Sequence, residues 1–209
     1  MHDQITYEQY SEIVYRGIAL GKNTDVYVAL LRAINLGSIN KVPMKDLALM
    51  FADAGCASVK SYIQSGNVVF TAPKGVCDGL CEKMSTQIEK RFGHKPPMML
   101  RTAGQMAKVV RYNPYAKPGA DDKTLHVVFL ADKPKKEDIA RLDPNRSPGD
   151  EYTFRGQEIY LRLPNGMGNS KLTNAYLDSK LQTISTSRNW RTTQTLLEMM
   201  TDLSKEITK

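Results

Sequence analysis

The chain has 209 residues, of which 41% are hydrophobic and 24% are charged. These values are near the averages of soluble globular proteins, so they argue against a disordered chain, a collagen-like repeat and a coiled coil. No apolar run approaches the roughly 18 residues that a membrane helix needs, and the first ten residues lack the apolar stretch of a secretory signal. We therefore expect a cytoplasmic protein without a membrane partner, in which the odd set of three cysteines stays reduced.

The net charge is +7, from 29 Lys and Arg against 22 Asp and Glu. Residues 83–117 contain eight Lys or Arg and one acid, so this stretch equals the whole excess. Such a run is typical of a solvated helix face, and it is also compatible with a nucleic-acid footprint. Both interpretations stay open on the sequence alone.

Residues 1–22 predict an N-terminal helical extension. Tyr7, Tyr10, Val14 and Ile18 follow one another at spacings of three and four, which gives one apolar helical face. The face either packs on the domain that follows or binds a partner.

Residues 23–102 predict a first α+β half. A nearly continuous apolar run over 26–34 indicates a buried strand, and helical periodicity follows up to Gly55. Two strand-like segments, 59–64 and 67–72, are joined by Ser65-Gly66, where glycine supplies the positive φ of a tight turn. A second helix over 76–92 and a short strand over 98–101 complete the β-α-β-β-α-β order of a ferredoxin-like domain, also called split βαβ.

Residues 103–209 predict a second half that echoes the first. A short helix capped by Thr102 opens it, followed by a strand over 124–131, a charged helix over 134–142 and a hairpin around Gly156. A glycine-rich loop and two further helices end the chain, with no clear final strand. The sequence thus predicts the α+β class, with two ferredoxin-like halves, antiparallel or mixed sheets and the N-terminal helical extension.

The sequence gives little support for a metal site or for a catalytic nucleophile. Cys77 and Cys81 lie four apart, but the sequence offers no set of four zinc ligands at a typical spacing. The chain has only three histidines, and it contains no G-x-S-x-G elbow. We therefore predict neither a metal site nor a cofactor, and we leave enzymatic activity undecided.

Four polar clusters are candidates for binding. The loop 165–171 follows a strand and precedes a helix, so its amides and Lys171 suit an anion, or Ser170 is a plain helix cap. Arg32 interrupts an apolar strand and therefore either pairs internally or contacts a ligand. Residues 64–67 fit hairpin chemistry, although the amides of Gln64 and Asn67 could also contact a ligand. Residues 186–191 contain helix-capping groups and the only tryptophan, which is either a core anchor or the wall of a site.

The same clusters carry a resemblance to a known family. The chain resembles DUF1697, a bacterial domain family of unknown function, over about residues 25–203. The segments concerned are 27–37, 40–44, 62–70, 170–173 and 188–190. Family members usually read Arg-Gly-Ile-Asn-Val-Gly where this chain has Arg-Ala-Ile-Asn-Leu-Gly from Arg32 to Gly37. The resemblance implies two ferredoxin-like halves and brings no established reaction, cofactor or partner.

Our functional hypothesis is that a small anionic or phosphorylated ligand binds in a polar, positively charged cleft between the two halves. If a reaction occurs there, Lys41 or Lys171 could act as the base. The alternative hypotheses are a non-catalytic nucleic-acid-binding module that uses the basic stretch 83–117, and an assembly protein that uses the N-terminal helix. The predicted ligand-binding residues are Arg32, Asn35, Lys41, Gln64, Ser65, Asn67, Gly168, Ser170, Lys171, Arg188, Asn189 and Trp190.

Overall fold

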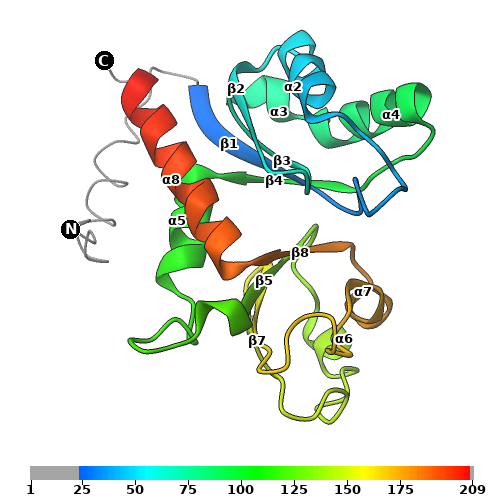
Figure 1. The fold of residues 1–209 in the computed structure, drawn as a ribbon, viewed down its shortest axis with the longest axis vertical. Coiled ribbons are helices and arrows are strands. Elements are labelled where there is room, and N and C mark those ends of the chain that lie inside the picture. The colour runs from blue at the N-terminus through cyan, green and yellow to red at the C-terminus, as the bar shows by residue number, and fades with distance from the viewer. Residues whose placement is uncertain (1–23, 208–209) are drawn as a thin grey trace. The chain divides into compact units, whose positions relative to one another are not determined.

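A computed structural model describes residues 24–207 of the chain (Figure 1). The helix predicted within residues 1–22 lies outside the described residues. The described chain forms two four-stranded antiparallel sheets and seven α-helices, which confirms the α+β class. No helix among these residues is long and apolar enough to cross a membrane.

The elements alternate in a pattern that occurs twice. The first series is β1 (Thr24–Leu31), α2 (Met44–Asp53), β2 (Ala57–Tyr62), β3 (Asn67–Pro73), α3 (Lys74–Cys77), α4 (Leu80–Phe92), β4 (Met98–Thr102) and α5 (Ala103–Arg111). The second is η1 (Asp122–Thr124), β5 (Leu125–Leu130), α6 (Lys136–Ile139), β6 (Glu151–Arg155), β7 (Glu158–Arg162), α7 (Asn174–Leu181), β8 (Ser185–Asn189) and α8 (Trp190–Ile207).

The chain divides into two compact units. The first runs to Tyr112 and includes the chain from Thr195 onward, and the second runs from Asn113 to Gln194. This division follows packing, whereas the predicted domains 23–102 and 103–209 follow the order of the elements along the chain. The two descriptions differ over α5 and most of α8, which both belong to the first unit.

The sheet of the first unit has the strand order β2-β3-β1-β4, and all neighbouring strands are antiparallel. Strand β1 lies inside the sheet, which explains its continuous apolar run, because both of its faces are covered. Tyr27, Ala29 and Leu31 belong to the core formed with α2 and α4. Val28 and Leu30, which point to the opposite face, are also fully buried.

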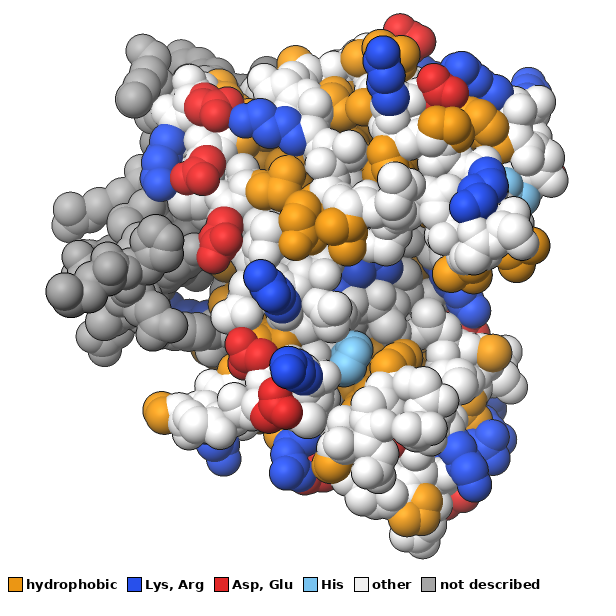
Figure 2. Space-filling view, viewed as in Figure 1, with side chains coloured by type: hydrophobic (Ala, Val, Ile, Leu, Met, Phe, Trp, Pro, Cys, Tyr) orange, Lys and Arg blue, Asp and Glu red, His pale blue; other side chains and the backbone are white. Residues whose placement is uncertain are grey.

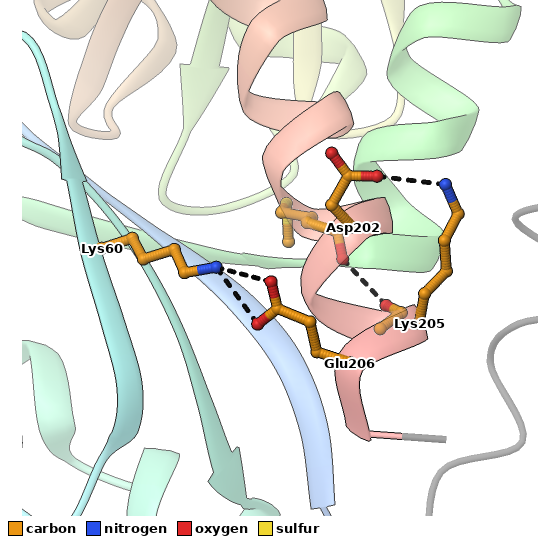
Figure 3. A network of polar contacts seen from close by, with 6 residues as sticks. Lys60, Asp202, Lys205 and Glu206 are labelled. Carbon is orange, nitrogen blue, oxygen red and sulfur yellow. Dashed lines mark hydrogen bonds and ion pairs between the residues drawn. The ribbon is translucent and has the colours of Figure 1, made fainter. Parts of the chain in front are cut away.

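That opposite face is covered by α5 and the C-terminal part of α8. Helix α5 contacts β1 and β4, and its buried side chains lie outside the core under α2 and α4. On β2, Lys60 points to the same face as Val28 and forms an ion pair with Glu206 of α8, with 2.9 Å between Nζ and Oε1 (Figure 3). The central strand β1 is therefore covered on both faces, whereas most residues of the edge strand β2 are exposed.

The sheet of the second unit repeats the order as β6-β7-β5-β8, again antiparallel. Its apolar core joins Val128 and Leu130 of β5 to Leu177 and Leu181 of α7. Strand β8 corrects the expectation that the second half lacks a final strand. Its sequence, Ser-Thr-Ser-Arg-Asn, has no apolar residue and so gives no strand pattern, but its pairing with β5 settles the conformation.

Three further boundaries differ from the expectation. The link between β2 and β3 covers residues 63–66 and is longer than the predicted pair Ser65-Gly66. The predicted helix 76–92 is interrupted between α3 and α4, where Gly79 takes a left-handed conformation with φ 73°. Helix α7 begins at Asn174, after its cap Thr173, rather than directly after the glycine-rich loop.

Candidate functional site

The predicted residues of the first unit lie on two connected segments, the β1–α2 loop (residues 32–43) and the β2–β3 turn (residues 63–66). Asn35 joins them. Its side-chain amide donates to the carbonyls of Val42, at 3.0 Å, and Gln64, at 2.9 Å, and its Oδ1 accepts from the Val42 amide at 2.9 Å. Loop and turn are therefore held as one piece, and Asn35 is occupied by this structural role.

The backbone of these two segments is unusually rich in left-handed conformations. The φ angles are 57° at Ala33, 54° at Asn35, 53° at Gly37, 52° at Asn40 and 46° at Ile63. Glycine and asparagine adopt this region readily, whereas a residue with an ordinary Cβ pays about 1–2 kcal/mol there. Ala33 and Ile63 are therefore strained.

The loop presents hydrogen-bond donors that the described chain does not use. The amides of Gly37, Ser38 and Lys41 donate to no described residue. Lys41 is exposed and forms no ion pair with a described residue, and the side chain of Gln64 is exposed as well. Successive amides in a left-handed turn, with a cation beside them, form the kind of concavity that binds anions. Arg32, half-buried, lies at the start of the loop, where its amide donates to Pro97 O at 2.9 Å.

Ser65 and Asn67 build the turn. Asn67 is fully buried, and its amide donates to Tyr62 O at 3.2 Å and to Ser65 Oγ at 2.9 Å. Between them, Gly66 has φ 77°, and an added Cβ would lie 2.8 Å from Leu31 Cβ. The requirement for glycine at this turn, expected from the sequence, thus has two causes, its dihedral angle and the close approach of β1.

The glycine-rich loop of the second unit uses most of its own amides. Internal turns engage the amides of Gly166, Asn169 and Ser170. The Lys171 amide donates to Ser147 Oγ at 3.0 Å, and the Leu172 amide to Ser170 Oγ at 3.1 Å. Ser170 therefore stabilises the loop, while the exposed Gly168 and the exposed ammonium group of Lys171 remain as the parts of this loop that can face a ligand.

Residues Arg188 and Asn189 point to opposite faces of the second sheet, because they are successive residues of β8. Arg188 lies opposite Val127, and Asn189 lies opposite His126. Nη1 of Arg188 donates to Thr186 Oγ1 and Ser187 O, both at 2.9 Å. Burial lowers the pKa of this guanidinium to about 10.

The remaining two residues of the predicted set are part of the helix start and the core. Asn189 Oδ1 accepts from the Thr192 amide at 2.7 Å, which makes Asn189 the N-cap of α8. Trp190 is 2% exposed. Of the two alternatives raised for Trp190, core anchor or wall of a site, its burial favours the core anchor.

Sequence reasoning gave little weight to His126. It is buried on β5, and its Nδ1 has no hydrogen-bond partner among the described residues. Burial lowers its pKa, and a hydrogen bond with the Thr124 backbone opposes that shift. A single histidine inside an apolar strand carries no sequence signal for such an environment.

The cysteines are poor nucleophiles in this fold. All three are free thiols. Burial raises the pKa of Cys56 and that of Cys81 to about 11, so both are protonated at neutral pH. Within residues 24–207, no group of three or more His, Cys, Asp or Glu side chains is arranged to hold a metal ion.

The basic stretch 83–117 is not one continuous surface. Arg91 pairs with Asp46 at 3.2 Å, Lys95 pairs with Glu82, and Arg101 is 4% exposed. The exposed cations of α4 and those of α5 lie on helices that cover opposite faces of the first sheet. Figure 2 shows Lys and Arg side chains interspersed with Asp and Glu over the face in view.

Base stacking is likewise unsupported by the strands. Proteins that bind RNA on a sheet stack bases on exposed strand aromatics, but Phe70 of β3 and Phe129 of β5 are fully buried. The arrangement of cations and aromatic residues thus offers no support for the nucleic-acid interpretation.

Comparisons with known proteins place the chain in a family. The family model described as "Protein of unknown function (DUF1697)" matches residues 24–160, so the chain belongs to the DUF1697 family. The match confirms the resemblance seen in the sequence, although the segments 170–173 and 188–190 lie beyond its end.

One solved structure gives the fold independently. It is described as the structure of a conserved bacterial protein, SP0830, from Streptococcus pneumoniae. The two share 21% sequence identity with a TM-score of 0.60, over 85% of this chain and 99% of the other. At this identity the likeness concerns the fold alone. No curated protein matches the chain.

Proposed function

We propose that this protein binds a small anionic or phosphorylated ligand, and that the β1–α2 loop with the β2–β3 turn is the principal contact. The observation that carries the proposal is the left-handed loop that Asn35 braces. Its Gly37, Ser38 and Lys41 amides have no partner in the described chain, and the exposed Lys41 side chain belongs to the same loop. Backbone strain of this kind persists only where surrounding contacts impose it, and it concentrates at functional sites.

The chemistry of the loop suits an anion better than a neutral ligand. Amide N–H groups and an ammonium group only donate hydrogen bonds, so they match a phosphate or carboxylate group, which accepts them. Gln64 adds a side-chain amide that can orient the rest of the ligand. The loop contains no Asp or Glu that could bind a cation in the way that Lys41 can bind an anion. A cationic ligand is therefore not favoured.

The proposal also assigns roles to Arg32, Lys171 and Arg188, the other cations of the predicted set. Lys171 is exposed, so it can meet an anion without rearrangement. Arg188 is 7% exposed, and its guanidinium would contribute positive charge to the proposed site. That all twelve predicted residues contact a single ligand remains a prediction. The proposal concerns binding and assigns no reaction.

We also propose that each sheet with its helices is a ferredoxin-like half, which the repeated β-α-β-β-α-β order and the repeated strand order β2-β3-β1-β4 support. The cytoplasm remains the proposed compartment, because reduced thiols persist there.

A thermal-shift screen tests the binding proposal. The probes are inorganic phosphate, pyrophosphate, nucleotides and sugar phosphates, each against NaCl of equal ionic strength. A ligand at 100 times its Kd stabilises the fold by about 2.7 kcal/mol, which corresponds to a rise in Tm of roughly 5–10 °C for a chain of this size. We expect Lys41→Ala to abolish most of that rise, and Arg32→Ala and Lys171→Ala to reduce it.

Lys90→Ala is the matched control, because Lys90 is an exposed lysine on α4 away from the loop. It should leave the rise in Tm intact. The proposal fails if no probe stabilises the protein beyond the NaCl control, or if Lys41→Ala binds as the unmodified chain does.

A further inference from the structure

The β1–α2 loop and the β2–β3 turn also expose three large apolar side chains. Leu36 is 52% exposed, Ile39 is 60% exposed and Ile63 is 51% exposed. Leu36 and Ile39 face each other across a β-bridge, with the Ile39 amide donating to Leu36 O at 2.9 Å. Ile63 directly precedes Gln64, whose carbonyl accepts from Asn35, so all three side chains stand on the single piece that Asn35 holds together.

Ile63 is the most informative of the three. It is β-branched and has φ 46°, a conformation that is rare for such residues. Burial of its side chain in the core would offset the strain, but half of the side chain is exposed. The structure thus holds an apolar side chain at the surface in an unfavourable backbone conformation, beside a loop rich in unused donors. Contact with an apolar group of a ligand would supply the missing stabilisation.

The size of this apolar group favours a small molecule. A stable protein interface uses roughly 20–30 residues on each side, whereas the group has three. Single exposed apolar residues are ordinary on protein surfaces, but these three lie on two segments that Asn35 joins by hydrogen bonds. The same loop also carries the exposed cation Lys41. An apolar contact and a cation therefore lie together on one loop, which complements a molecule that has an apolar part attached to an anionic group.

Building on the proposed function, we infer that the ligand is an amphiphilic small anion, in which a phosphate or carboxylate group is attached to an alkyl or aromatic moiety. The anionic group binds the amides of Gly37 and Ser38 and the Lys41 ammonium. The apolar moiety covers Leu36, Ile39 and Ile63. A bare inorganic anion then fills only half of the site.

Isothermal titration with a homologous series separates the two halves of the site. The probes are methyl phosphate and hexyl phosphate, which share the anionic group, and 1-hexanol, which shares only the tail. A fully buried methylene strengthens binding by about fourfold, so partial contact over the longer tail should give hexyl phosphate at least a roughly tenfold lower Kd than methyl phosphate. Hexanol alone should bind far more weakly than hexyl phosphate.

Ile63→Asn removes the apolar side chain and places a residue there that tolerates the left-handed conformation, so the turn is expected to fold. It should bring the hexyl-to-methyl affinity ratio close to one. Leu49→Asn is the matched control, because Leu49 is equally exposed, at 52%, but lies on α2; this variant should retain the ratio. Lys41→Ala should weaken the binding of both phosphates.

Each outcome has a distinct meaning. Equal affinities for methyl and hexyl phosphate would overturn the inference and leave the proposed anion site standing. Absence of binding by both phosphates of this series and by every probe of the thermal-shift screen would overturn the proposed function itself. A final arm uses sedimentation with vesicles of phosphatidylcholine containing phosphatidylserine: binding to the vesicles that Ile63→Asn abolishes, without binding of soluble hexyl phosphate, would assign the surface to a membrane and refute the inference.

Discussion

Replacing Ala33 with glycine should stabilise the protein, contrary to the usual effect of an Ala→Gly change. Ala33 has φ 57° and an exposed side chain. Relief of the left-handed strain is worth about 1–2 kcal/mol, and the extra freedom of glycine in the unfolded chain costs about 0.4–1 kcal/mol. The exposed methyl group contributes little burial. We therefore expect a net gain of about 0.5–1 kcal/mol in the free energy of unfolding.

Urea unfolding followed by circular dichroism measures this gain. With an m-value of about 2 kcal/mol/M, the midpoint should rise by roughly 0.3–0.5 M. Ala52→Gly is the control, because Ala52 is also exposed but lies in helix α2, where the same change should destabilise the fold by about 0.5–1 kcal/mol. Equal destabilisation by the two substitutions would refute the strain at Ala33.

Two further predictions concern the first unit. Gly66→Ala should destabilise the fold by about 2–5 kcal/mol, since it combines a left-handed residue with overpacking against Leu31; Gly75→Ala, where an added Cβ meets nothing within 4 Å, should be near neutral in the same urea titration. Stability should also fall above pH 9. Burial raises the pKa of Cys56 and Cys81 from 9.0 to about 11, so between these values the unfolded chain loses protons that the folded chain retains. Urea titrations from pH 8 to 11 should show this decline, and a slope that Cys81→Ala leaves unchanged would contradict the assigned cause.

The internal repeat explains one of the predicted ligand-binding residues, Asn189, as a helix cap. In each unit, the last strand runs directly into a helix, and the junction residue caps that helix: Thr102 forms a capping box with Gln105 at the start of α5, and Asn189 accepts from the Thr192 amide at the start of α8. Both caps were expected from residue type alone. Helix capping at this position of the repeat therefore explains the presence of Asn189 without any ligand. The β1–α2 loop is thus a better-supported ligand contact than Asn189.

Strand alternation also restricts which predicted residues can act together. Neighbours in the sequence need not share a face, and Arg188 and Asn189 do not. Polar groups that the sequence suggests for ligand binding can instead form hydrogen bonds with residues far away in the chain. Asn35 bonds to Gln64 O, 29 residues away, and Lys171 bonds through its amide to Ser147, 24 residues away.

The amino-acid sequence by itself determined the α+β class, the buried strand β1, the glycine turn at Gly66 and the family. These features depend on local periodicity, on a dihedral angle or on a motif, all of which are properties of neighbouring residues. Only the tertiary structure decided that the polar segment Ser185–Asn189 is a strand, that Arg188 is buried and that Asn35 is a brace, because each depends on hydrogen-bond partners and neighbours far away in the chain. The strain at Ala33 and Ile63 belongs to the same group: it exists because distant contacts impose a backbone conformation that these residues would not adopt on their own.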